Sequence, residues 1–168
     1  MATTGLADSQ REELNELSKE CAVFFSANMS IGVSLLAELA KKAAAVLGTS
    51  FDVEIIEKHH NQKIDAPSGT ALMIADAISE EVKDTQYVYD RHAYRKKREK
   101  NEIGIHAIRG GTIVGEHEVL FAGHDEVVSI RHQAQSKGVF AAGAVNAAVF
   151  IKDKPAGLYD MSDVLKAC

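Results

Sequence analysis

The sequence predicts an α+β domain, in which a mixed and largely antiparallel sheet has helices packed on one face. Two observations support this prediction. Helical and strand patterns alternate in the first half of the chain, whereas three strand patterns follow one another in the second half. The helical segments are rich in Ala, and small residues at positions 141–144 suggest that one helix packs closely against the sheet.

The first part of the chain predicts a helix, a strand and a second helix. Ser9 begins a capping-box pattern, and the leucines that follow keep helical spacing. Residues 21–25 form an apolar run that predicts a short buried strand, with Cys21 expected to be a buried thiol. Residues 31–47 are rich in Ala and Leu and predict a helix that ends before Gly48.

The middle of the chain predicts a strand, a loop and a helix. Apolar and polar residues alternate in residues 51–57, as in a strand with one buried face. Pro67 disfavours a helix before it, and a helix is expected over residues 68–82. Residues 84–101 have no clear period and contain a basic run, which we interpret as a solvated loop. Phosphate binding and a subunit contact are the alternatives for this run.

The last part of the chain predicts three strands and a helix. The strands are expected at residues 103–108, 113–122 and 127–135, paired as an antiparallel meander. A helix over residues 139–150 and a short element over residues 157–165 complete the chain. Such a sheet leaves an edge or a face exposed, which is normally covered, often by another subunit.

Composition limits the class of protein. The chain has 168 residues, a hydrophobic fraction of 46% and a net charge of −5, which favour a globular domain and argue against non-specific nucleic-acid binding. No apolar stretch reaches the length of about 18 residues that a membrane helix needs, and no signal-peptide pattern opens the sequence. Cys21 and Cys168 make no disulfide framework, so we expect a cytoplasmic protein.

Residues 57–72 carry the strongest functional signal. His59, His60 and Lys63 follow the predicted strand, where a rigid element can aim a loop at a ligand. Histidine exchanges protons near neutral pH, and repulsion among these cations makes a proton donor more labile. A polar surface loop is one alternative. A metal site is another, but adjacent histidines do not easily bind one ion and no third ligand follows at zinc spacing, so we expect no metal.

The same segment continues with Ser68, Gly69 and Thr70 at the predicted start of a helix. Backbone N–H groups, hydroxyl groups and the helix dipole can together hold a carboxylate or a phosphate there. The alternative is an ordinary helix N-cap. Combined with the preceding His/Lys cluster, the turn predicts a pocket for a small dianion beside a proton donor.

Two further features are open to more than one interpretation. Residues 26–29 lie at the carboxyl end of a predicted strand, the edge at which ligands gather in open α/β sheets. Asn28 either binds a ligand or caps the next helix. His117 lies between Glu116 and Glu118 on a predicted strand, and we interpret it as a solvated or interface histidine.

At this point a family resemblance becomes clear. The segment Glu-Lys-His-His-Asn-Gln-Lys-Ile-Asp-Ala-Pro-Ser-Gly-Thr-Ala-Leu closely resembles the signature of the 4-hydroxy-tetrahydrodipicolinate reductase (dihydrodipicolinate reductase) family of bacterial and plant lysine biosynthesis. Shorter blocks along the rest of the chain resemble the same family. They lie at residues 2–5, 26–30, 109–117 and 157–161.

The resemblance implies an NADPH- or NADH-dependent reductase, which converts a cyclic imine dicarboxylate to tetrahydrodipicolinate in diaminopimelate and lysine biosynthesis. His59 matches a proton donor or acceptor of the family, and Lys63 matches a second proton donor. The matches to substrate-binding positions are His60, Ser68, Gly69 and Thr70. The matches to positions that line the nicotinamide are Ala2, Thr3, Thr4, Ser26, Ala27, Asn28 and Met29.

The N-terminus differs from the family pattern. Family chains begin with a Rossmann domain, whereas this sequence starts where that domain is ending. We interpret residues 1–27 as a remnant of the dinucleotide-binding domain and residues 28–150 as a substrate-binding and oligomerisation domain that forms a homotetramer through its sheet. Residues 151–168 are a C-terminal return segment. The chain alone is expected to have little or no reductase activity.

Two other functions stay open. One is a non-catalytic, truncated module that keeps the substrate pocket and the assembly surface. The other is a metal-dependent hydrolase that uses the histidines.

Overall fold

The computed structural model describes residue 1 and residues 6–167, so the predictions for Ala2, Thr3, Thr4 and Cys168 lie outside the described residues. The described residues form two compact units. Unit 1 contains the two ends of the chain, up to Leu35 and from Lys137 onward, and unit 2 spans Leu36–Ser136. The functional division expected at residues 27 and 150 has different boundaries, and it stays a prediction.

Unit 2 is built on a five-stranded mixed sheet with the strand order β3-β4-β2-β5-β6. Strands β3, β4 and β2 run parallel to one another, and β2, β5 and β6 pair antiparallel. The strands are β2 (Asp52–His59), β3 (Gln86–Val88), β4 (Glu102–Arg109), β5 (Gly115–Ala122) and β6 (Val127–Ala134). The predicted α+β class with a mixed sheet is therefore confirmed.

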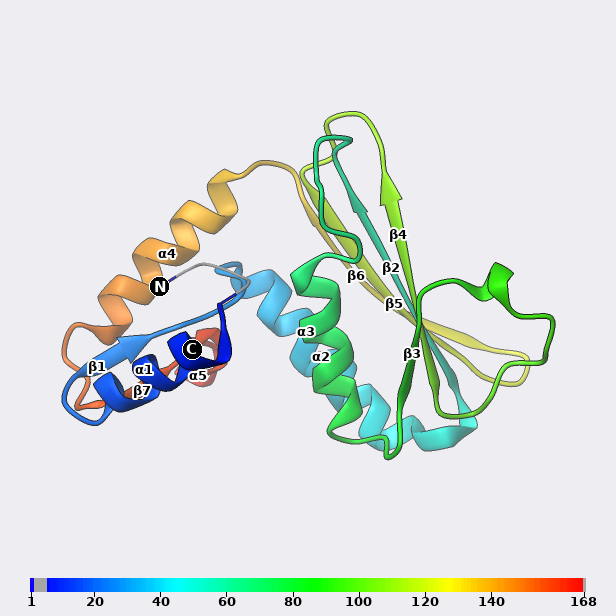
Figure 1. Cartoon of the computed structure of the whole chain (residues 1–168), viewed down its shortest axis with the longest axis horizontal. Coiled ribbons are helices and arrows are strands. Elements are labelled where there is room, and N and C mark those ends of the chain that lie inside the picture. The colour runs from blue at the N-terminus through cyan, green and yellow to red at the C-terminus, as the bar shows by residue number, and fades with distance from the viewer. Residues whose placement is uncertain (2–5, 168) are drawn as a thin grey trace. The chain divides into compact units, whose positions relative to one another are not determined.

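One face of this sheet is covered by α3 (Gly69–Ser79) and by the part of α2 (Ile31–Leu47) that belongs to unit 2 (Figure 1). Burial alternates strictly along β2, so every second side chain points to the helices. Ile55 is fully buried there, and in the sheet register it pairs with Ile105 on one side and Val119 on the other. This row forms the centre of the apolar core.

The predicted antiparallel meander is wrong in one respect, because β4 and β5 are not neighbours. Strand β2 lies between them, and β4 pairs with it in parallel. The connection from β4 to β5 instead crosses the carboxyl end of β2, where Gly110 N–H donates to His59 O at 2.9 Å and Asn61 N–H donates to Gly111 O at 3.2 Å. Adjacency in the sequence does not fix pairing, since the central position belongs to β2, which precedes both of these strands in the chain.

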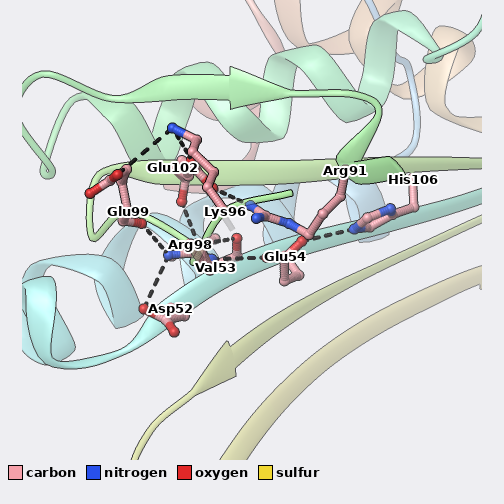
Figure 2. Close-up of polar contacts among 9 residues, drawn as sticks. All are labelled: Asp52, Val53, Glu54, Arg91, Lys96, Arg98, Glu99, Glu102 and His106. Carbon is pink, nitrogen blue, oxygen red and sulfur yellow. Dashed lines mark hydrogen bonds and ion pairs between the residues drawn. The ribbon is translucent and has the colours of Figure 1, made fainter. Parts of the chain in front are cut away.

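The basic run that was expected to be a solvated loop is instead tied to the sheet (Figure 2). Arg98, whose side chain is 15% exposed, donates to Glu54 and Asp52 at 3.0 Å each and to Val53 O at 2.9 Å. The buried carboxylate of Glu102 pairs with Arg91. Asp52 and Glu54 are the polar members of the β2 alternation, so they face away from the helices and attract the basic segment.

Unit 1 contains a two-stranded parallel sheet of β1 (Ala22–Phe24) and β7 (Gly157–Tyr159). Its helices are α1 (Asp8–Ser18), α4 (Gly138–Ile151) and α5 (Met161–Lys166). Helix α4 packs very close to the backbone of the loop after β1, since a Cβ added at Gly143 would lie 1.7 Å from Met29 O.

Two local predictions for unit 1 are wrong. Cys21 is exposed rather than buried, because the strand begins only after it. Helix α1 is capped at Ala7, whose N–H donates to the Gln10 side chain at 2.9 Å, rather than at Ser9. In the described part of the chain, no helix is both long and apolar enough to cross a membrane.

Candidate active site

The candidate active site of unit 2 begins on the helix-covered face of β2. The alternation that buries Val53 and Ile55 continues to Glu57 and His59. The sequence had suggested that His59 lies in a loop, but it is the last residue of strand β2. Glu57 is 0% exposed, so its carboxylate is a charged group inside the core and needs partners.

Four nitrogen atoms surround the Glu57 carboxylate. Oε2 lies 2.6 Å from His59 Nδ1 and accepts from Arg109 Nη1 at 2.7 Å. Oε1 accepts from Arg109 Nη2 at 2.7 Å and from the backbone N–H of Ser68 at 3.0 Å. These partners come from the end of β2, the end of β4 and the start of α3, so one carboxylate joins three elements.

The partners of Glu57 also fix its charge. Burial by itself raises the pKa of this carboxyl, but the hydrogen bonds from His59, Arg109 and Ser68 lower the pKa to about 2. The hydrogen bond between Glu57 and Arg109 in turn raises the pKa of Arg109. Glu57 is therefore ionised at neutral pH and acts as an acceptor only.

Ser68 is the N-cap of α3 and is buried. Its hydroxyl accepts from Ala71 N–H at 3.2 Å and lies 3.1 Å from His117 Nε2. The capping interpretation of the Ser-Gly-Thr turn is thus realised for the Ser68 side chain. Gly69 and Thr70 are the first two residues of α3, at the end of the helix where its dipole favours an anion.

His117 was missed by the sequence reasoning. It is 3% exposed, and its ring packs edge-on against that of His59 with 5.2 Å between centroids. Burial, and then the charge of His59, lower the pKa of His117 to about 3, so it is neutral at physiological pH. A signal was present, because His117 has the same parity along β5 as the fully buried Val119 and Phe121.

The loop after β2 carries the remaining predicted side chains of this unit. Lys63 is partly buried and forms an ion pair with Asp65 at 2.9 Å, which lowers the pKa of that carboxyl. Its backbone N–H donates to His60 O at 3.1 Å. Arg109, which was not predicted, fixes this loop by donating to Asp65 O at 2.6 Å. Within residue 1 and residues 6–167, no three His, Cys, Asp or Glu side chains gather as metal ligands would.

The predicted nicotinamide-lining loop belongs to unit 1. The Ser26 hydroxyl donates to Asn28 O at 2.7 Å, and Asn28 Oδ1 accepts from Ser30 N–H at 2.8 Å. Ser30 Oγ accepts from Val33 N–H in the first turn of α2, so the capping role considered for Asn28 falls to Ser30. Met29 is buried in the core of unit 1, while Ala27 is exposed.

Comparisons with known proteins agree with this arrangement. The family described as "Dihydrodipicolinate reductase, C-terminus" matches residues 32–165. The chain belongs to this family.

Individual relatives and a solved structure give the same result. The chain is 55% identical over 167 residues to the 4-hydroxy-tetrahydrodipicolinate reductase of Caldanaerobacter subterraneus and 52% identical over 168 residues to that of Clostridium novyi. Each match covers 99% of this chain but 66% of the relative, so the chain spans just under two thirds of their length. The structure of "Dipicolinate bound Dihydrodipicolinate reductase from Paenisporosarcina sp. TG-14" matches with a TM-score of 0.71 and 28% identity, over 95% of this chain and 61% of that one.

Proposed function

We propose that this chain is the substrate-binding part of an NAD(P)H-dependent 4-hydroxy-tetrahydrodipicolinate reductase of diaminopimelate and lysine biosynthesis. Family membership and the names of the relatives support the proposal. The observation that carries it is the Glu57 carboxylate, which contacts both His59 at the end of β2 and the backbone at the start of α3. It thereby holds a proton-exchanging histidine next to the anion-binding turn. That arrangement suits an anionic substrate that must receive a proton.

The proposed ligand is a ring with two carboxylates. Gly69 and Thr70 at the start of α3 receive one carboxylate, and the side chains of His60 and Lys63 bind the other. The related solved protein is described as bound to dipicolinate, a planar ring dicarboxylate, which supports this assignment.

The reaction adds a hydride and a proton to the conjugated ring, and the 4-hydroxyl group leaves as water. NADPH or NADH supplies the hydride when it is bound. His59 or Lys63 delivers the proton to the anion that develops, and the nearby positive charges stabilise that anion. Neutral His117 beside His59 adds no competing charge at physiological pH.

Residues 1–27, we further propose, continue a dinucleotide-binding sheet. Met1 pairs in the parallel pattern alongside the edge of β1 opposite β7, because its N-terminus donates to Phe24 O and its carbonyl accepts from Ser26 N–H at 3.3 Å. Helix α4 is apolar all round, yet Val145 and Val149 are 63% and 71% exposed. An apolar groove lies beside them and is lined by Met1, Phe24, Met29, Ala144, Ala147, Ala148 and Ile151.

An open strand edge beside an exposed apolar helix is a surface that further parallel strands and helices normally cover. The loop 26–29 is proposed to line the nicotinamide, and the assignment of Ala2, Thr3 and Thr4 to cofactor binding rests on the sequence resemblance alone. Residues 28–150 form the substrate-binding and oligomerisation domain, and residues 151–168 return to the first part through β7.

The face of the five-stranded sheet opposite the helices is proposed as the contact of a homotetramer. It carries exposed Ile108 and Val127 next to charged pairs such as Lys58 with Glu116. Apolar side chains that stand among paired charges are typical of a surface covered by another subunit. Light scattering after gel filtration measures the assembly directly. The cytoplasmic location stays a prediction.

The test combines activity and binding. NADPH oxidation is followed with the product of the upstream synthase, and the melting temperature is measured with pyridine-2,6-dicarboxylate. The variants His59→Ala and Lys63→Ala should abolish any rate. A rate of zero with a raised melting temperature favours the non-catalytic module. A rate that needs NADPH and survives a chelator excludes the metal-dependent hydrolase, and an unchanged melting temperature contradicts the dicarboxylate pocket.

A further inference from the structure

We propose that Glu57 and Arg109 form a positioning pair, which holds His59 in the tautomer with its proton on Nδ1 and ties that imidazole to the start of α3. The inference rests on the proposed function only in giving His59 its role in proton transfer. The geometry of the pair stands independently.

The groups around Glu57 determine which nitrogen of His59 carries the proton. Glu57 receives three assigned hydrogen bonds, two from Arg109 and one from the Ser68 backbone, and His59 Nδ1 lies 2.6 Å from Oε2. These three fixed donors keep the carboxylate ionised, and an ionised carboxylate has no proton to donate. Because Glu57 only accepts, the ring nitrogen that faces it must carry the proton.

The other ring nitrogen of His59, Nε2, points away from Glu57. With the proton on Nδ1, the Nε2 atom of neutral His59 is the one available to accept a proton or, once protonated, to donate it. Gly115 lies beside this atom, since a Cβ added there would be 3.2 Å from Nε2. The glycine at the start of β5 therefore leaves space next to the reactive nitrogen, and a larger residue at this position would reduce that space.

The two carboxylate oxygens of Glu57 contact different parts of the site. Oε2 serves His59, Oε1 serves the Ser68 backbone, and Arg109 bridges both with its two terminal nitrogens. The proton-exchanging ring and the anion-binding turn are thus set by one rigid pair. Arg109 also supports the intervening loop through Asp65 O. A movement of the carboxylate would displace both halves of the site.

The variant Glu57→Gln is the sharpest change available. It keeps the size of the side chain but replaces one oxygen with an NH₂ group. In one orientation this group faces His59 Nδ1 and Arg109 Nη1, and in the other it faces the Ser68 N–H and Arg109 Nη2. Either orientation sets donors against donors. Glu102→Gln is the matched control. Glu102 lies at the opposite end of β4 from Arg109, and it is a similarly buried carboxylate that pairs with Arg91.

The tautomer is measured on the 168-residue chain by ¹⁵N–¹H correlation NMR of the histidine rings at pH 8. We expect His59 to carry its proton on Nδ1 in the wild type and in Glu102→Gln, and a mixture of tautomers in Glu57→Gln. The dissociation constant for pyridine-2,6-dicarboxylate, measured by calorimetry, should rise about tenfold or more in Glu57→Gln and less than about twofold in the control.

Arg109→Lys separates the two roles of the pair. It keeps a positive charge and the Glu57–His59 bond but loses the fork, so the tautomer should persist while the dicarboxylate binds less tightly. A wild-type His59 with its proton on Nε2 overturns the proposal, even if Glu57→Gln fails to fold. So does a folded Glu57→Gln that keeps both tautomer and affinity. If the wild type does not bind the dicarboxylate, the proposed function fails, while the tautomer result still decides this inference.

Discussion

Ser68 and His117 meet across unit 2, with 3.1 Å between the serine hydroxyl and the histidine Nε2, although 49 positions separate them in the chain. The hydroxyl also accepts from Ala71 N–H, so a single buried atom caps α3 and contacts a side chain of β5. This contact fixes the start of α3 to the sheet at the point where the proposed anion-binding turn begins.

Ser68→Ala should therefore destabilise the fold by about 1 to 3 kcal/mol, because it removes a helix cap and leaves a buried ring nitrogen without its partner. Urea unfolding followed by circular dichroism measures the change. Ser18→Ala is the control, since the Ser18 hydroxyl bonds only its own exposed helix end at Asn15 O, and a change within about 0.5 kcal/mol is expected there. Equal effects of the two substitutions would contradict the structural role of Ser68.

Stability should depend on pH through His117. Its pKa in the folded chain is lowered to about 3, mainly by burial, whereas an unfolded histidine has a pKa of about 6.5. Between these values the unfolded state binds more protons, so the free energy of unfolding falls as the pH falls, by up to about 1.4 kcal/mol per pH unit. Above pH 7 the contribution is constant.

The measurement is urea unfolding at several values between pH 7.5 and pH 5. His117→Gln removes the titrating ring, so its unfolding free energy should change less steeply with pH over this range. The exposed His124, replaced by Gln, should leave the slope as it is in the wild type. The Glu57 carboxyl, whose pKa is lowered to about 2, adds a further loss only below about pH 4.5. A wild-type slope equal to that of His117→Gln would exclude the buried neutral histidine.

The sequence predicts most elements well, since their signals are local. The alternation in residues 51–57 identifies β2, and residues 31–47 match α2 at both ends. Strand order is not a local property, and the central place of β2 therefore could not be predicted from the succession of strands. The same limit hid the role of Arg109, because its bond to Glu57 joins residues 52 positions apart and depends on β4 lying beside β2.

The parity of His117 was a signal that local reasoning could have used. Its neighbours Glu116 and Glu118 are polar and suggested a solvated strand, but they point to the other face of the sheet. Val119 and Phe121, two and four positions further on, mark the buried face. His117 is a polar residue at a buried position of the sheet, where apolar residues are the rule. Exceptions to this rule are expected at functional sites.

The basic segment should depend on Arg98. Arg98→Ala removes a side chain that contacts Asp52, Glu54 and three carbonyl groups, so we expect a loss of about 1 to 3 kcal/mol and a loosened segment around Tyr94. Cleavage by chymotrypsin after Tyr94 should become faster than in the wild type. Arg95→Ala, on an exposed side chain of the same segment, is the control. Equal cleavage rates for both variants would mean that Arg98 does not hold the segment.

Unit 1 should be most sensitive at Gly143. A Cβ at this position would lie 1.7 Å from Met29 O, a backbone atom that cannot move aside as a flexible side chain can, so α4 must shift away from the loop after β1. We expect Gly143→Ala to destabilise this unit by about 2 kcal/mol or more, although Ala is otherwise the better helix former. Gly110→Ala, where an added Cβ meets nothing within 4 Å, should change stability by less than about 1 kcal/mol. Hydrogen exchange resolved by residue shows where the loss falls: faster exchange confined to α4, β1 and β7 is the expected pattern, and uniform protection in Gly143→Ala would contradict the close contact.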